Sequence, residues 1–285
     1  MGMATVPDRA SHREARASAE IPRAAVVAGI ALAAVTAVSG IDPHHGGVWL
    51  AENVLTLFVA GWLALTARSF PLSTPSYALL LGFLVLHEFG AHFTYPRVPY
   101  DQAVAEWTGF SIDRALGLER NHWDRLVHAA FGVAFAVPLR EVALRIAGVR
   151  GFWSFALPLA AVLSIGLAYE FAEWAVAVSW GVGPASAFLG AQGDPWDAHH
   201  DLLLAGAGAS LSLAVAAASE ALGDRQAFVR EWRESVRVKA PVGGRPPAAA
   251  AVPTIAEPLR AHVPAPARES AAVARGDGSR AYPAA

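Results

Sequence analysis

The chain has 285 residues, of which 54% are hydrophobic and only 16% are charged. Soluble domains carry about a quarter charged residues, so this composition is typical of a membrane protein. The formal net charge of −2 gives no reason to expect nucleic acid as a partner. The chain contains no cysteine, which excludes disulfides, thiolate metal sites and cysteine nucleophiles.

Long apolar segments dominate the chain between its two polar ends. A helix that crosses the bilayer needs about 20 apolar residues, and six segments have or approach this length: roughly 22–40, 48–67, 77–93, 122–139, 152–178 and 200–222. We therefore predict an all-α fold, a polytopic bundle of six transmembrane helices over residues 22–222.

The segments outside this bundle differ in composition. Residues 1–21 form a polar tail, and residues 223–239 form a basic amphipathic segment that we expect to lie on anionic lipid headgroups. Residues 240–285 are rich in Ala and Pro and cannot bury enough apolar surface to fold, so we expect a disordered tail.

The distribution of positive charge predicts the orientation in the membrane. With the N-terminus inside, the inner segments (1–23, 68–76, 140–151 and 223–245) carry fourteen Lys and Arg residues. The outer segments (40–47, 94–120 and 181–199) then carry three. Cytoplasmic connections are enriched in Lys and Arg, so we expect both termini in the cytoplasm.

This topology places ionisable residues of four helices at the outer end of the bundle. Residues three or four apart share a helix face, and such pairs are Glu88 and His92, Asp124 and His128, Glu170 and Glu173, and Asp197 and Asp201. A charge facing lipid at the bilayer centre costs ~2.5–3.5 kcal/mol even on lenient scales. We therefore predict one outward-opening polar pocket, roofed by residues 94–120 and 181–199.

The residue types in this pocket indicate several roles. We expect Glu88, Glu170 and Asp201 to act as catalytic acids or bases. Arg125 would bind an anion, and we expect further substrate contacts from Asn121, Asp197 and Glu173.

A bound metal is the sharpest hypothesis for the histidines. His92, Asp124 and His128 have spacing and chemistry that suit a divalent ion such as Zn or Mn. The alternative is a buried hydrogen-bond network in which Arg125 neutralises Glu170 or Asp201.

Other positions have a structural interpretation or an open one. Ala205 and Gly208 continue the face of Asp201 and would let a neighbouring helix approach closely. Residues 101–118 can form short helices broken at Gly109. Glu52 and Asn53, near the start of the second segment, either line the pocket or sit at the membrane interface.

Four motifs carry a family resemblance. HEFGAHFTYPRVP, RNHWDRLVHAAFG, YEFAEW and LGAQGDPWDAHHDLLLAGAGA, in this order over roughly residues 40–222, resemble the bacterial inner-membrane YjdF family. The resemblance implies a multi-spanning protein of the bacterial inner membrane and no established activity. The order of DRLVH, YEFAEW and DPWDAHHDLLLAGAGA is also similar to the VanZ-like family, which implies a shared pocket architecture.

Three classes of function remain open. The first is an enzyme or binding protein whose outer pocket takes a lipid headgroup or a small envelope molecule, for example to hydrolyse it. The second is a transporter of a small polar solute, although the inner halves of the helices hold almost no titratable residues. The third is a non-catalytic membrane protein whose polar network fixes helix packing.

Overall fold

The computed structural model describes residues 20–180 and 191–238, and it is all-helical over these residues. The helices are α2 (Arg23–Ser39), α3 (Gly46–Thr66), α4 (Thr74–Phe93), η1 (Tyr95–Arg97), α5 (Tyr100–Thr108), α6 (Ile112–Leu116), α7 (Trp123–Arg145), α8 (Trp153–Trp180), α10 (Asp197–Gly223) and α11 (Arg225–Ser235). The predicted all-α class is confirmed over the described residues. The expected tail at 240–285, residues 1–19 of the expected tail at 1–21 and residues 181–190 of the expected loop at 181–199 lie outside the described residues.

Five of these helices are long and apolar enough to cross a membrane, namely α3, α4, α7, α8 and α10. Each coincides with one of the predicted apolar segments. The remaining segment forms α2, an apolar helix of 17 residues. At 1.5 Å per residue α2 is about 26 Å long, slightly shorter than the ~30 Å hydrocarbon core.

Local sequence signals explain where several elements end. The turn after α4 begins at Thr94, which has a positive φ of 61°, and Pro96 follows within η1. Gly109 ends α5 in the left-handed conformation, with φ of 72°, and α6 follows as a separate helix. The predicted break of this region at Gly109 is confirmed.

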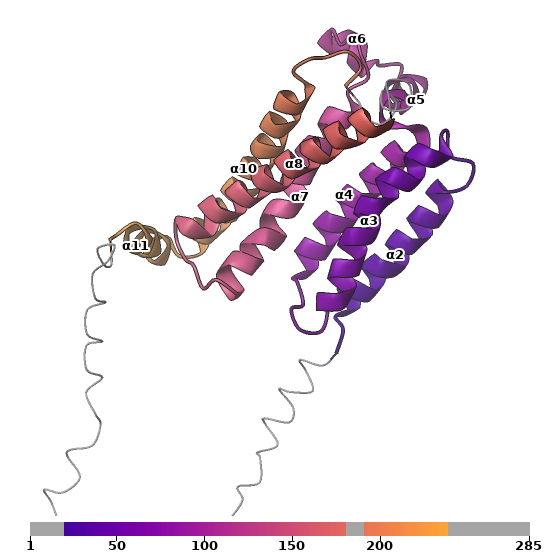
Figure 1. Ribbon diagram of the computed structural model, residues 1–285. Coiled ribbons are helices and arrows are strands. Elements are labelled where there is room, and N and C mark those ends of the chain that lie inside the picture. The colour runs from indigo at the N-terminus through magenta and orange to yellow at the C-terminus, as the bar shows by residue number, and fades with distance from the viewer. Residues whose placement is uncertain (1–19, 181–190, 239–285) are drawn as a thin grey trace, which may run out of the picture. The chain divides into compact units, whose positions relative to one another are not determined.

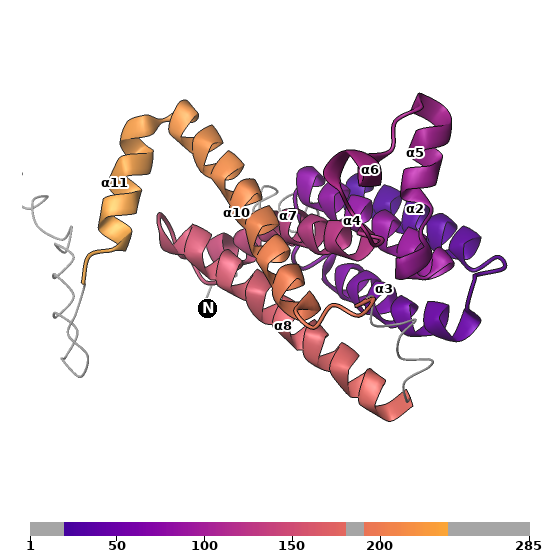
Figure 2. The same ribbon diagram turned by 90° about the horizontal axis from the view of Figure 1, so that it is seen from above.

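The long helices form two neighbouring groups. Helices α2, α3 and α4 make one group, and α7, α8 and α10 make the other, with α4 packed against α7 between them (Figure 1). Helices α5 and α6 lie at one end of the bundle, beside the start of α7. Helix α10 packs closely against α7 (Figure 2). The core therefore centres on α7, which contacts helices of both groups.

Small residues allow the close crossing of α7 and α10. A Cβ atom added to Gly132 would lie 1.9 Å from the carbonyl oxygen of Ala205, and one added to Gly208 would lie 2.2 Å from that of Ala129. Ala205 is fully buried at this contact. The predicted role of Ala205 and Gly208 in close helix packing is confirmed.

Candidate functional site

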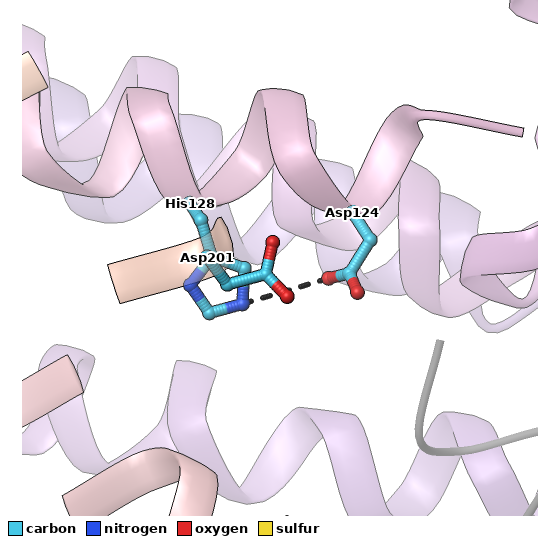
Figure 3. Close-up of side chains that lie close together, drawn as sticks. All are labelled: Asp124, His128 and Asp201. Atoms are coloured by element: carbon cyan, nitrogen blue, oxygen red, sulfur yellow. Dashed lines mark ion pairs between the residues drawn. The ribbon is translucent and has the colours of Figure 1, made fainter. Parts of the chain in front are cut away.

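A carboxylate–histidine centre lies where α7 and α10 cross. Asp124 and His128 stand one turn apart on α7, and Asp201 faces them from α10 (Figure 3). Each of the three offers a ligand atom, and these atoms lie within 4.8 Å of one another. All three residues are buried, and the Nε2 atom of His128 lies 3.6 Å from Oδ1 of Asp124.

Helix α8 adds a third carboxylate to this centre. Oε1 of Glu170 lies 3.7 Å from Nε2 of His128. Oε1 of Glu170 and Oδ1 of Asp201 are both buried, and neither has a hydrogen-bond partner in the described part of the chain. A buried carboxylate oxygen without a donor is costly, so these two atoms call for a proton or a cation. Imidazole and carboxylate ligands suit Zn or Mn.

The arginines near this centre are paired with other carboxylates. Nη2 of Arg125 lies 2.6 Å from Oδ2 of Asp194, and Nη2 of Arg120 lies 2.6 Å from Oδ1 of Asp197. His200 joins the first pair, with its Nδ1 atom 3.1 Å from Asp194. Arg125 therefore forms no ion pair with Glu170 or Asp201 in the described part of the chain, although its charge still acts on Asp201. Asp194, which precedes α10, is the ion-pair partner of Arg125.

Asn121 holds the turn that leads into α7. Its side-chain amide donates to the carbonyl of Val98 at 2.8 Å, and its Oδ1 atom accepts from the backbone N–H of Trp123 at 2.9 Å. Gln192 donates to the backbone carbonyl of Asn121 at 2.8 Å. Of the predicted substrate contacts, Arg125 and Asp197 thus belong to an ion-pair network with Arg120 and Asp194, and Asn121 holds the neighbouring turn.

Glu88 and His92 lie in a different part of the bundle. Glu88 is fully buried among α2, α3 and α4, and accepts hydrogen bonds from the hydroxyl groups of Thr36, Ser39 and Thr56. The Nδ1 atom of His92 lies 2.8 Å from the backbone oxygen of Ser39.

The prediction that one pocket contains all of these ionisable residues is therefore wrong for Glu88 and His92. They do share one face of α4, but that face turns toward α2 and α3 and away from α7. Among the described residues, Asp201 joins Asp124 and His128 where the sequence had suggested His92.

A cavity of about 380 Å³ begins beside the centre and lies between α3, α4, α7 and α8. Asp124 and His128 line both the cavity and the centre. The other polar residues of its lining are Glu52, His87, Tyr95, Tyr169 and Glu173. The hydroxyl of Tyr169 donates to Oε2 of Glu52 at 3.3 Å, which links α8 to α3.

The sequence does not decide whether Glu52 lines the pocket or sits at the membrane interface, and it indicates no role for His87 or Tyr169. The structure places Glu52 and Glu173 on the cavity wall, while Glu170 and Asp201 lie outside the lining. His87 contacts the hydroxyl of Tyr95 at 2.6 Å and the backbone oxygen of Glu52 at 3.1 Å. The signal for Glu52 was an acidic residue within an apolar segment, which is seldom tolerated unless it faces other helices.

Fold and site together define a multi-pass helical membrane protein with a buried carboxylate–histidine centre near one end of its bundle. The chain belongs to the family described as "Predicted membrane protein (DUF2238)", which matches residues 24–221. It is similar to the inner membrane protein YjdF of Escherichia coli (strain K12), with 37% identity over 172 residues. That match covers 60% of this chain and 78% of the relative. No solved structure matches the chain.

The apolar helices and this relative identify a multi-pass protein of the inner membrane. The resemblance read from the four motifs is confirmed.

Proposed function

We propose that the protein crosses the inner membrane six times, with both termini in the cytoplasm. The support is the excess of Lys and Arg in the inner connections together with six apolar helices, of which α2 is the shortest. Alkaline phosphatase inserted near Asp42, between α2 and α3, should then be active, because it would be exported. If alkaline phosphatase were inactive when inserted near Asp42 and active when inserted after Ala67, the opposite orientation would hold.

We propose further that Asp124, His128 and Asp201 bind a divalent cation, with Glu170 beside them. One observation carries this proposal, namely that three ligand atoms lie within 4.8 Å of one another beside two unpartnered carboxylate oxygens. The nearby arginines form their ion pairs with Asp194 and Asp197, and neither forms one with Glu170 or Asp201 in the described part of the chain. A purely structural network would be expected to satisfy its buried acceptors, so the geometry favours a binding site.

The function that this centre supports best is binding a polar group at the outer side of the membrane and hydrolysing it. A bound cation would polarise a phosphoryl or carbonyl oxygen or lower the pKa of a water molecule. Glu170, whose Oε1 atom lies 3.7 Å from Nε2 of His128, would accept a proton from that water. Candidate ligands are a lipid headgroup or a small molecule of the cell envelope.

Transport of a polar solute is less well supported. A transport route needs polar groups through both leaflets. Away from its polar end, the cavity is lined by side chains such as Phe135, Leu139 and Trp62. We therefore rank binding and catalysis above transport.

Metal analysis of the purified full-length chain tests the cation site. After purification with Zn²⁺ or Mn²⁺, we expect about one ion per chain, and loss of that ion in Asp201→Asn and His128→Ala. His199→Ala is the matched control, because His199 is an exposed histidine on α10. Absence of a stoichiometric ion from the folded wild type, or equal retention in all variants, would overturn the proposal.

A further inference from the structure

We infer that the cavity between α3, α4, α7 and α8 holds an acyl chain of a membrane phospholipid, whose polar part faces the carboxylate–histidine centre. The placement of that polar part rests on the proposed function of the centre. The placement of the chain rests on the cavity alone. The inference names the class of ligand: an amphiphile that enters from the bilayer.

The walls of the cavity suit a hydrocarbon chain. Beyond the polar residues at its outer end, three phenylalanines form one wall, with the ring centroid of Phe83 5.9 Å from that of Phe131 and 5.3 Å from that of Phe135. Leu55, Val59 and Leu139 add aliphatic surface. Its volume of about 380 Å³ lies within the ~300–1,000 Å³ typical of small-molecule sites, which are mostly apolar with a few polar groups.

The cavity also reaches the surface of the protein that faces lipid. Phe58 of α3 and Ile165 of α8 both line the cavity, yet they are 73% and 42% exposed. At 1.5 Å per residue, Phe58 lies about 18 Å along α3 from Gly46, and Ile165 lies about 18 Å along α8 from Trp153. Both residues are therefore near the middle of a hydrocarbon core that is ~30 Å thick. At this depth the protein is surrounded by the acyl chains of the bilayer.

Polar side chains line the outer end of the cavity, and a hydrogen bond there joins two of its helices. The bond from Tyr169 to Glu52 joins α8 to α3 there, and Asp124 and His128 line the same end. A polar solute arriving through the lateral mouth would have to leave water and cross hydrocarbon. A phospholipid already in the bilayer pays no such cost, because its chain moves from one apolar environment to another.

Photo-crosslinking tests the inference directly. The full-length protein is reconstituted with a phospholipid that carries a diazirine in its acyl chain, and the labelled residues are mapped by mass spectrometry. We expect label on Phe83 and Val127, which line the cavity and are only 4% and 5% exposed, so that lipid at the outer surface cannot reach them. Label confined to surface residues of the wild type would overturn the inference.

Two matched variants test the mouth. Ile165→Trp should abolish labelling of Phe83 and Val127 by filling the entrance. Leu167→Trp should not, because Leu167 is equally exposed, at 43%, and does not line the cavity. Unchanged internal labelling in Ile165→Trp would contradict entry through this mouth.

A third variant separates this inference from the proposed cation site. Asp201→Asn should lose the metal and keep the internal label, because Asp201 lies outside the cavity lining. If the wild type bound metal but Phe83 and Val127 were not labelled, only the acyl-chain inference would be overturned. If these residues were labelled but no metal was bound, only the proposed cation site would be overturned.

Discussion

Gly132 of α7 meets Ala205 of α10 backbone to backbone, with no room between them for a single additional carbon. A Cβ atom at position 132 would lie 1.9 Å from the Ala205 carbonyl oxygen. This contact lies one turn from both His128 on α7 and Asp201 on α10. The close approach of the two helices therefore sets the separation of the groups in the centre.

Substitution of Gly132 should disturb both stability and metal binding. We expect Gly132→Val to push α10 away from α7, to lower the free energy of unfolding by roughly 1–3 kcal/mol, and to weaken metal binding. Gly82→Val on α4 is the control, because nothing lies within 4 Å of its added Cβ atom. Thermal melting and metal titration check this, and equal effects of the two substitutions would contradict it.

Glu88 should contribute to stability and not to the centre. In Glu88→Ala the hydroxyl groups of Thr36 and Thr56 lose their acceptor, and Ser39 keeps only the backbone oxygen of Thr36, at a cost of about 1–3 kcal/mol for a buried polar group. Metal content should stay at the wild-type level. If Glu88→Ala lost the metal while its melting temperature was unchanged, Glu88 would have to be returned to the site.

Acid should weaken the ion-pair network of Asp194, Arg120 and Arg125. Its carboxylate accepts the backbone N–H of Trp196 and interacts with His200 and Arg120, which hold its pKa below the usual value. A lowered pKa in the folded state stabilises the fold above the unfolded pKa of ~3.9, and this contribution is lost as the pH falls below it.

The melting temperature of the wild type should therefore drop more steeply than that of Asp194→Asn as the pH is lowered through about 4. Glu119→Gln, an exposed acid in the same region, serves as the control and should follow the wild type. Identical pH profiles for Asp194→Asn and the wild type would contradict this account.

Helix α11 combines several arginines with apolar residues that contact α8. Phe228 and Trp232 contact Phe155 of α8, and Ser235 accepts the backbone N–H of Phe152 at 2.9 Å. Arg225, Arg230, Arg233 and Arg237 line one surface groove of α11 and the residues after it. We expect this groove to hold anionic lipids, because basic residues near such a surface contribute about 1 kcal/mol each.

Reversal of three charges along this groove provides the test. The combined change of Arg230, Arg233 and Arg237 to Glu should reduce the anionic lipid that copurifies with the protein, measured by lipid mass spectrometry. Arg97→Glu, at the other end of the bundle, should leave it unchanged. Equal lipid content in both variants would contradict a role for α11.

The sequence by itself determined the elements of this protein. Hydropathy located the ends of the long helices to within three residues, except that α7 continues six residues beyond the predicted end to Arg145, and Gly109 marked a break between α5 and α6. Helical spacing placed Asp124 beside His128 and Glu88 beside His92, and small residues predicted the close crossing at Ala205 and Gly208. These features are local, because they depend on the length, rise and periodicity of a single helix.

Only the tertiary structure decided which face of each helix meets which neighbour. A span that is apolar on all sides carries no periodic signal for its rotation about its own axis. For this reason the turn of Glu88 and His92 toward α2 could not be predicted, nor could the pairing of Arg125 with Asp194. The meeting of Asp201 with His128 needed the crossing of two helices far apart in the chain, and the cavity needed four.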